Sequence, residues 1–216
     1  MSDAVFDPYA VPGMPELAPA QRDALEAAYA DPPRAYHSFA HVGQVMREMA
    51  AVLAAPGWHR PREVWLAVLY HDAVYVPGAT GNEVRSARMA GDAITRWLPD
   101  AGIDAGRVAG LIELTARHGQ HRPEDFPDDA DGDDTRRFLD CDMAILGAPA
   151  ARFDAYDRAI AAEYRDRVPG WLYRMQRRRF LAALLKRPRI YLSAEFHNRL
   201  DTAARANLRR TLATRR

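Results

Sequence analysis

The sequence predicts an all-α protein. Apolar residues recur at helical spacing in run after run along the 216 residues, and no segment shows convincing strand alternation. Prolines and glycines separate the runs, as expected where helices begin and end. The spacing is clearest in the segment 42–53, where apolar residues fall on one side of a helix. The length suits one domain with its own core, and no internal repeat divides it.

Helix start and stop signals divide the first half of the chain into an arm and five helices. The Pro-rich residues 1–18 predict an irregular N-terminal arm. Proline is favoured in the first turn of a helix, so Pro19 and Pro61 each predict a start. Ser38 and Asn82 have side chains that cap helices. The predicted helices are 19–30, 38–55, 61–72, 82–98 and 104–118.

The second half adds a loop and at least four helices. The acidic stretch 119–134 contains proline and glycine and is long for a loop, so it is either a functional lid or a mobile segment. Gly147 suits the left-handed residue that follows a helix. The predicted helices are 138–146, 149–168, 170–185 and one or two across 193–213. We expect a single helical domain over residues 19–216, with a basic part from about residue 163.

The net charge of +1 conceals an asymmetry along the chain. Residues 1–162 have a charge balance of −10, and residues 163–216 have one of +11. On a helix, Arg174, Arg177 and Arg178 would share one side. We expect a solvated face that pairs with the acidic body, and phosphate binding by one or two arginines is the second alternative. No nucleic-acid fold signature accompanies the basic segment, so nucleic acid is not an expected partner.

Composition excludes several other classes. The single cysteine, Cys141, excludes a disulfide scaffold and favours a reducing compartment. The N-terminal residues lack the basic start and apolar run of a signal peptide. No apolar stretch reaches about 18 residues, which a membrane span requires. We therefore expect a cytoplasmic protein with no membrane partner.

Histidines and aspartates next to apolar runs indicate a metal site. His71 and Asp72 end an apolar helix, and Asp142 lies in an apolar segment, where a lone carboxylate is costly. With His41 they offer nitrogen and oxygen ligands from separate helices for a divalent metal such as Mn²⁺, Fe²⁺, Ni²⁺ or Zn²⁺. His37 precedes His41 by four residues and would share its helix face. The alternative is that each histidine is a core residue with its hydrogen bonds satisfied.

These residues carry a resemblance to a known family. The order of His, His-Asp and a distant Asp resembles the HD superfamily of metal-dependent phosphohydrolases, and in particular its branch of small predicted phosphohydrolases. The resemblance covers residues 34–213 and implies a helical bundle of the HD-domain type. The segments that carry it include Tyr36-His37-Ser38, His41-Val42, Tyr70-His71-Asp72-Ala73-Val74-Tyr75, Asn82-Glu83 and Phe138-Leu139-Asp140-Cys141-Asp142-Met143.

The resemblance implies roles for the matching residues. His41 is similar to the first ligand, His71 and Asp72 to the pair that names the superfamily, and Asp142 to the last ligand, with Asp140 as the alternative.

Further residues are implied around these ligands. His37 and His118 are implied as additional ligands or as residues that orient ligands. Glu83 matches an acid that helps to activate water, although a glutamate there also complements a helix dipole. Arg34 or Arg85 would offset charge on a phosphate.

The expected function is hydrolysis of a small phosphate ester, nucleotide-like in character, by water activated on one divalent metal ion (Mn, Fe, Ni, Zn or Mg). Asp72 or Glu83 would accept the proton. One alternative is a non-catalytic HD-fold protein that binds a nucleotide or a protein partner, and a more distant one is a di-iron HD oxygenase. The substrate, the metal and the oligomeric state stay open, with a homodimer as a common arrangement of soluble enzymes.

Overall fold

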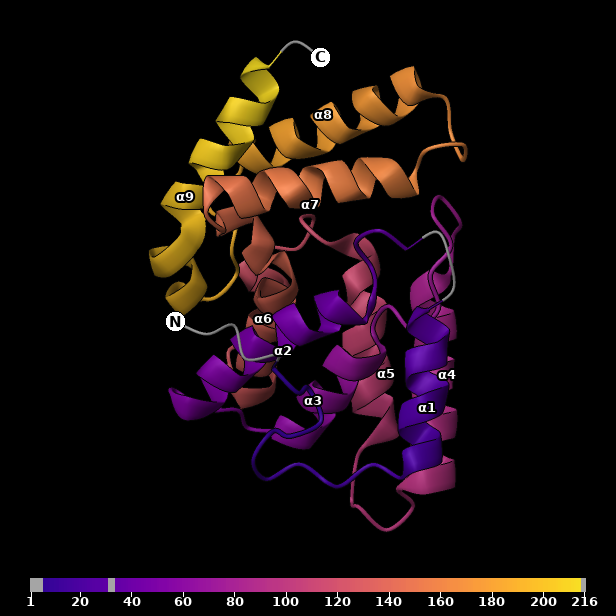
Figure 1. The fold of residues 1–216 in the computed structure, drawn as a ribbon. Helices are drawn as coiled ribbons and strands as arrows, with labels where there is room; N and C mark the ends of the chain where they lie inside the picture. Colours follow the sequence, from indigo (N-terminus) through magenta and orange to yellow (C-terminus); the bar gives the residue numbers. More distant parts are fainter. Residues whose placement is uncertain (1–5, 31–33, 215–216) are drawn as a thin grey trace. The chain divides into compact units, whose positions relative to one another are not determined.

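The fold is built from helices, as the sequence predicts. The structure is a computed structural model that describes residues 6–30 and 34–214 (Figure 1). Within these ranges the regular elements are α-helices and short 3₁₀ helices, with no strand. The chain divides into two compact units, residues 1–116 and 117–216.

Helix α3 (Pro61–Tyr70) is the centre of the first unit. All its residues from Glu63 onward are buried, so no face is left for solvent. A helix that is apolar all round belongs in the interior. It packs against α2 (Phe39–Ala54), α4 (Asn82–Trp97) and α5 (Ala105–Leu114). Its C-terminal end, which carries the His71-Asp72 pair, is therefore held from several sides.

The N-terminal arm packs onto this unit. Val11 and Leu17 are buried, and the indole Nε1 of Trp65 donates a hydrogen bond to the Pro8 carbonyl oxygen at 3.0 Å. The arm is irregular over its described residues, as expected, and it leads into α1 (Pro19–Tyr29). The part of the predicted arm that covers residues 1–5 lies outside the described residues.

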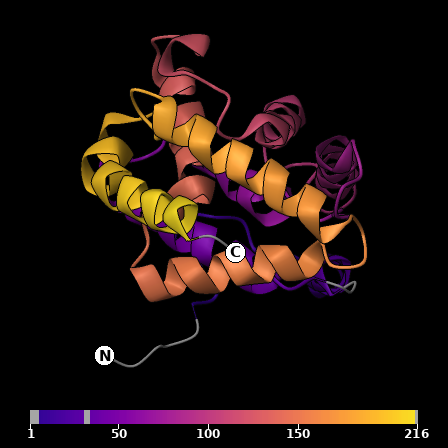
Figure 2. The ribbon, with the colours of Figure 1, turned by 90° about the horizontal axis from the view of Figure 1, so that it is seen from above.

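The second unit holds the remaining long helices. They are α6 (Ala130–Met143), α7 (Ala150–Glu163), α8 (Gly170–Lys186) and α9 (Ala194–Ala213). The 3₁₀ turn η3 (Ala144–Gly147) packs against α7 and α9, and α8 packs on α9. Seen from above, the C-terminal end of α9 lies between α7 and α8 (Figure 2).

Helix α6 begins at Ala130, so the prediction of a loop reaching residue 134 was wrong at its C-terminal end. The Asp129 carboxylate caps the helix by accepting a hydrogen bond from the Gly132 N–H at 2.8 Å. Asp131 and Asp133 lie in the first turn, where acids complement the helix dipole. A short 3₁₀ turn, η2 (Pro123–Asp125), orders part of the preceding segment. The C-terminal part of the acidic stretch, from Asp129 onward, is thus the start of α6.

Two residues occupy positions other than those expected. Gly147 is not among the left-handed glycines; a Cβ there would lie 2.7 Å from the Leu200 Cβ, so close packing against α9 requires the glycine. The cap of α4 is Gly81, with φ of 77°, and Asn82 is the first helical residue.

Across the part of the chain that the structure describes, no helix combines the length and apolar character needed to cross a bilayer.

Candidate metal centre

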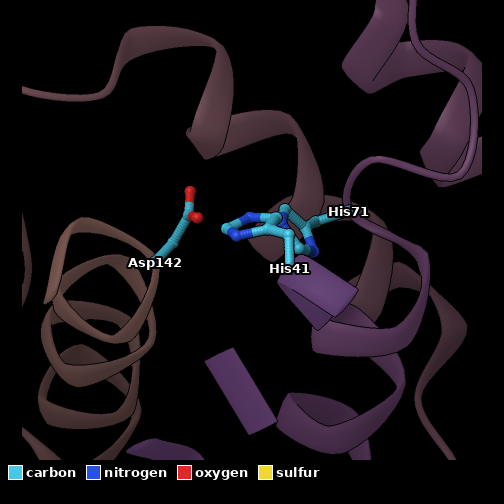
Figure 3. Close-up of side chains that lie close together, drawn as sticks. All are labelled: His41, His71 and Asp142. Carbon is cyan, nitrogen blue, oxygen red and sulfur yellow. The ribbon is translucent and has the colours of Figure 1, made fainter. Parts of the chain in front are cut away.

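Two buried histidines of the first unit bring their rings together. His41 lies in the first turn of α2, and His71 directly follows α3 (Figure 3). Their side chains are 2% and 1% exposed. The two Nε2 atoms are 3.1 Å apart. The two imidazole rings therefore direct their Nε2 atoms toward one point in the buried interior.

The backbone sets the ring orientation and tautomer of His71. Its Nδ1 lies 2.9 Å from the carbonyl oxygen of Val68, three residues earlier in α3. A carbonyl oxygen can only accept, so Nδ1 carries the hydrogen and donates it. In the neutral ring, Nε2 then has its lone pair directed away from the helix. This is the arrangement that holds a metal-binding imidazole in place.

Asp72 adds a carboxylate to the same point. Its Oδ2 lies 3.1 Å from His71 Nε2 and 3.6 Å from His41 Nε2, and its side chain is 16% exposed. Burial opposes ionisation, but His71, His37 and His41 together hold the pKa of Asp72 below its usual range. The carboxylate is therefore ionised and able to act as a ligand.

The separations of these three donors fit a single metal ion. Two ligand atoms at about 2.1 Å from a common ion are about 3.0 Å apart at a right angle and about 3.4 Å apart at a tetrahedral angle. Two of the observed separations are 3.1 Å and the third is 3.6 Å, slightly longer. Two imidazoles with one carboxylate suit a first-row transition metal. The residues present in the first unit thus fit the metal implied by the sequence.

Arg34 holds the backbone around this set. Its Nη1 donates to the carbonyl oxygens of His37, at 3.1 Å, and Asp72, at 2.8 Å, while its Nη2 donates to that of Ala73 at 2.9 Å. The guanidinium also lies over the Tyr29 ring, 5.1 Å from its centroid. Arg34 was expected to contact phosphate, and the structure places its donors on the chain's own carbonyl groups.

His37 lies beside the set without being one of its three converging donors. Its ring stacks on Tyr75 with centroids 4.0 Å apart, and its centroid is 5.9 Å from that of His41. Tyr75 belongs to the segment that follows Asp72, and His41 is itself one of the three donors. The stacking fixes the position of the His37 ring, and His37 adds positive charge near Asp72 when it is protonated.

The first turns of α4 are tied to the segment that follows Asp72. The Ser86 Oγ accepts from the Val74 N–H at 3.0 Å and donates to the Val74 carbonyl at 3.3 Å. The Asn82 side chain likewise accepts from the Val76 N–H at 3.1 Å and donates to the Val76 carbonyl at 3.0 Å. Side chains of α4 thus pair with the backbone after Asp72 as a neighbouring strand would.

Glu83 and Arg85 lie on this anchored turn. Glu83 is half-buried in the first turn of α4, three residues before Ser86 and hence on the same side of the helix. Arg85 is exposed, and its Nη2 donates to the Asn82 Oδ1 at 2.6 Å. Both expected roles, water activation by Glu83 and phosphate contact by Arg85, stay predictions.

In the second unit, Asp140 and Asp142 have different surroundings. Both Asp140 oxygens accept hydrogen bonds, from the Leu192 N–H at 2.8 Å and from the Ser193 N–H and Oγ at 2.7 Å each. Burial raises the pKa of Asp140 to about 7, although these three donors oppose the shift. Asp142 instead has its Oδ2 3.0 Å from Nδ1 of His118. Asp140 therefore fastens α6 to the start of α9, and Asp142 is paired with an imidazole that can orient it.

Three supporting contacts were not anticipated from sequence. They are the hydrogen bond from His71 to the Val68 carbonyl, the clamp that Arg34 forms by donating to backbone carbonyl oxygens, and the pairing of Ser86 with the Val74 backbone. A carbonyl leaves no sequence signal. Ser86 is a signal, because it falls at helical spacing with the apolar Ala90 and Ala93 of α4, and a buried hydroxyl requires a partner.

No match to the chain was found among protein-family models, curated proteins or solved structures.

Proposed function

We propose that this chain is a metal-dependent phosphohydrolase that acts on a small phosphate ester of nucleotide-like character. The observation that carries the proposal is the meeting of His41 Nε2, His71 Nε2 and Asp72 Oδ2 within 3.6 Å of one another in a nearly buried place. Buried groups of this kind need a proton or a cation between them to offset their lone pairs and charge. A divalent metal ion meets that requirement.

Asp142 is proposed as a further ligand. It completes the ordered His, His-Asp, Asp set of the sequence, in which it is similar to the last ligand of the HD superfamily. His118, 3.0 Å from the carboxylate, would fix its orientation, as partners of metal ligands do. Asp140 is proposed only as a structural residue, because both its oxygens already accept hydrogen bonds.

A bound divalent ion would polarise a phosphoryl oxygen and lower the pKa of a water molecule. The protein residues would do the remaining work. His41, His71 and Asp72 would hold the ion, and the hydrogen bond from His71 Nδ1 to the Val68 carbonyl would keep the His71 Nε2 unprotonated. Glu83 is the proposed acceptor for the proton of the attacking water, through a carboxylate oxygen.

The rival function is a non-catalytic protein that binds a nucleotide or a protein partner through the same fold. It predicts a helical protein in which the donor set is a hydrogen-bonded core cluster without metal. The two functions differ in metal content, so metal analysis separates them before any substrate is known.

The test is elemental analysis of protein purified without chelator and again after stripping and reloading with Mn²⁺, Fe²⁺, Ni²⁺, Zn²⁺ or Mg²⁺. We expect about one transition metal ion per chain, as for a mononuclear site with open positions. The loaded protein should release inorganic phosphate from p-nitrophenyl phosphate or from a nucleoside monophosphate. Circular dichroism of each variant establishes that it is folded.

Variants of the candidate ligands test whether metal content and phosphate release depend on the same residues. His71→Ala and Asp72→Asn should lose both metal and phosphate release, whereas His59→Ala, at an exposed histidine, should keep both. An Asp72→Asn protein that keeps its metal and its activity would overturn the assignment. A folded wild-type protein that takes up no metal after reloading would favour the binding function. Two irons per chain would instead point to the oxygenase.

A further inference from the structure

A pocket of about 880 Å³ lies within the second unit. It is lined by residues of α7, α8 and the C-terminal end of α9, together with the segment between α7 and α8. Its lining holds three aspartates and twice as many arginines, so it is cationic. The arginines are Arg158, Arg165, Arg174, Arg177, Arg178 and Arg210.

Two of these arginines are already paired. The Arg177 Nε donates to Asp157 Oδ1 at 3.0 Å, and the Arg210 Nη2 donates to Asp154 Oδ1 at 2.6 Å. Each pair is nearly neutral, and each fixes an arginine at the wall of the pocket. The positive charge available to a ligand therefore comes from the other four guanidinium groups.

Those four arginines have no carboxylate partner among the described residues. Arg158, Arg165, Arg174 and Arg178 are exposed, and Asp166 is the remaining acid of the lining. Arg174 and Arg178 are four residues apart on α8, so their side chains extend from the same face. Paired guanidinium groups on one face suit the oxygens of a phosphate, which they bind through several N–H donors at once.

The pocket also has an apolar and aromatic part. Tyr164 and Tyr173 both line it, with ring centroids 5.4 Å apart, and the buried Leu181 lines it as well. The Tyr173 hydroxyl is buried and has no hydrogen-bond partner within the described chain. Burial raises the pKa of Tyr173 to about 12, so this hydroxyl keeps its proton and can donate it. A buried donor without an acceptor is costly, and a ligand oxygen would satisfy it.

We propose that this pocket is a binding site for a small organic phosphate with a flat, apolar body, as in a nucleoside diphosphate. Arg174 and Arg178 would contact the phosphate groups, and the two tyrosine rings would contact the flat body. A merely solvated arginine surface would not account for the two tyrosine rings in the lining or for the unsatisfied Tyr173 hydroxyl. The site does not depend on the proposed hydrolysis, because none of its lining residues belongs to the proposed metal ligands.

The experiment is isothermal titration calorimetry of the full chain with ADP, in EDTA so that metal does not contribute. We expect one ADP per chain, and we expect weaker binding as ionic strength rises. Arg174→Gln combined with Arg178→Gln should raise Kd at least about tenfold, and Tyr173→Phe should raise it by a smaller factor. The matched control is Arg179→Gln on the same helix, outside the pocket lining, which should change Kd by less than about twofold.

Three results would overturn the proposal. The first is no binding of ADP up to about 1 mM. The second is adenosine binding as tightly as ADP, because the arginines would then have no role. The third is ADP binding that survives the double arginine variant but is lost in Asp72→Asn, which would place the ligand at the metal centre. Retained binding in a folded Asp72→Asn protein supports the pocket even where the hydrolase assignment has failed.

Discussion

Replacing Arg34 with methionine should destabilise the first unit and loosen the candidate ligands. The guanidinium donates three hydrogen bonds, to the carbonyl oxygens of His37, Asp72 and Ala73, at 2.8–3.1 Å. It also lies 5.1 Å from the centroid of the Tyr29 ring. Methionine keeps most of the apolar stem and removes every donor, so the variant isolates the clamp.

The expected magnitude follows from these contacts. An intramolecular hydrogen bond contributes about 1 kcal/mol net, and more when one partner is charged. Counted at the neutral value of about 1 kcal/mol each, three such bonds and one cation–π contact of about 0.5–1 kcal/mol would total about 3–4 kcal/mol. Arg34 is half-buried, so water can reach part of the released carbonyl surface. We therefore expect a loss of about 2–3 kcal/mol in the free energy of unfolding.

Urea unfolding followed by circular dichroism measures this loss, with an unchanged m value as the sign that only stability has changed. Hydrogen exchange should also show faster exchange at the amides of residues 72–74. The matched control is Arg88→Met, at an exposed arginine, which should shift stability by less than about 0.5 kcal/mol. A loss in Arg34→Met no larger than in the control, with a raised KM for substrate, would refute the clamp and favour the phosphate contact expected from sequence.

Three further perturbations test the second unit. Asp140→Asn places an amide donor against the donors of Ser193, so we expect a loss of about 1–3 kcal/mol in the free energy of unfolding with metal content unchanged. For Asp201, burial opposes ionisation, but the bonds from the Ile190 N–H and Arg205 hold its pKa below the usual range. The stabilisation by the ionised Asp201 is therefore present above about pH 3.9 and is lost as pH falls through the lowered pKa. We expect the stability difference between wild type and Asp201→Asn to shrink below about pH 3.9, and thermal melting across pH measures it. Gly147→Ala forces a Cβ against α9 and should cost about 1–3 kcal/mol in urea unfolding.

Each of these variants has a matched control. Asp128→Asn and Asp100→Asn remove exposed carboxylates and should leave stability and its pH dependence close to wild type. Gly91 lies within α4 and has open space around its missing Cβ, so Gly91→Ala should stabilise by about 0.5–1 kcal/mol. Loss of metal in Asp140→Asn, a pH-independent difference for Asp201→Asn, or stabilisation by Gly147→Ala would contradict the corresponding assignment.

The helical class and most helix positions could be predicted because apolar spacing and proline starts are local signals. Pro19 and Pro61 each open a helix, and the apolar run before His71 is the buried α3. The acidic run before Phe138 misled the prediction, since composition alone does not distinguish a polar loop from the charged first turns of a helix. Only the cap by Asp129 makes that distinction, and it depends on backbone geometry.

The candidate site was predictable as a set of residue types and less so as a set of roles. His41, His71 and Asp72 meet in the first unit, as their order along the chain suggested. The different surroundings of Asp140 and Asp142 were not predictable, because both are aspartates in the same apolar segment. Their partners come from residues far along the chain, and one sequence does not reveal such pairings.

The side-chain pairing between α4 and the segment after Asp72 has a consequence for which sequences the fold accepts. Asn82 and Ser86 each need one donor and one acceptor on a short side chain, because each satisfies both backbone groups of a single valine. Few amino acids meet that condition. In a library of all single substitutions, position 86 should accept threonine and little else, and position 82 should be similarly restricted. The exposed Val84 between them should accept almost any residue that forms helices.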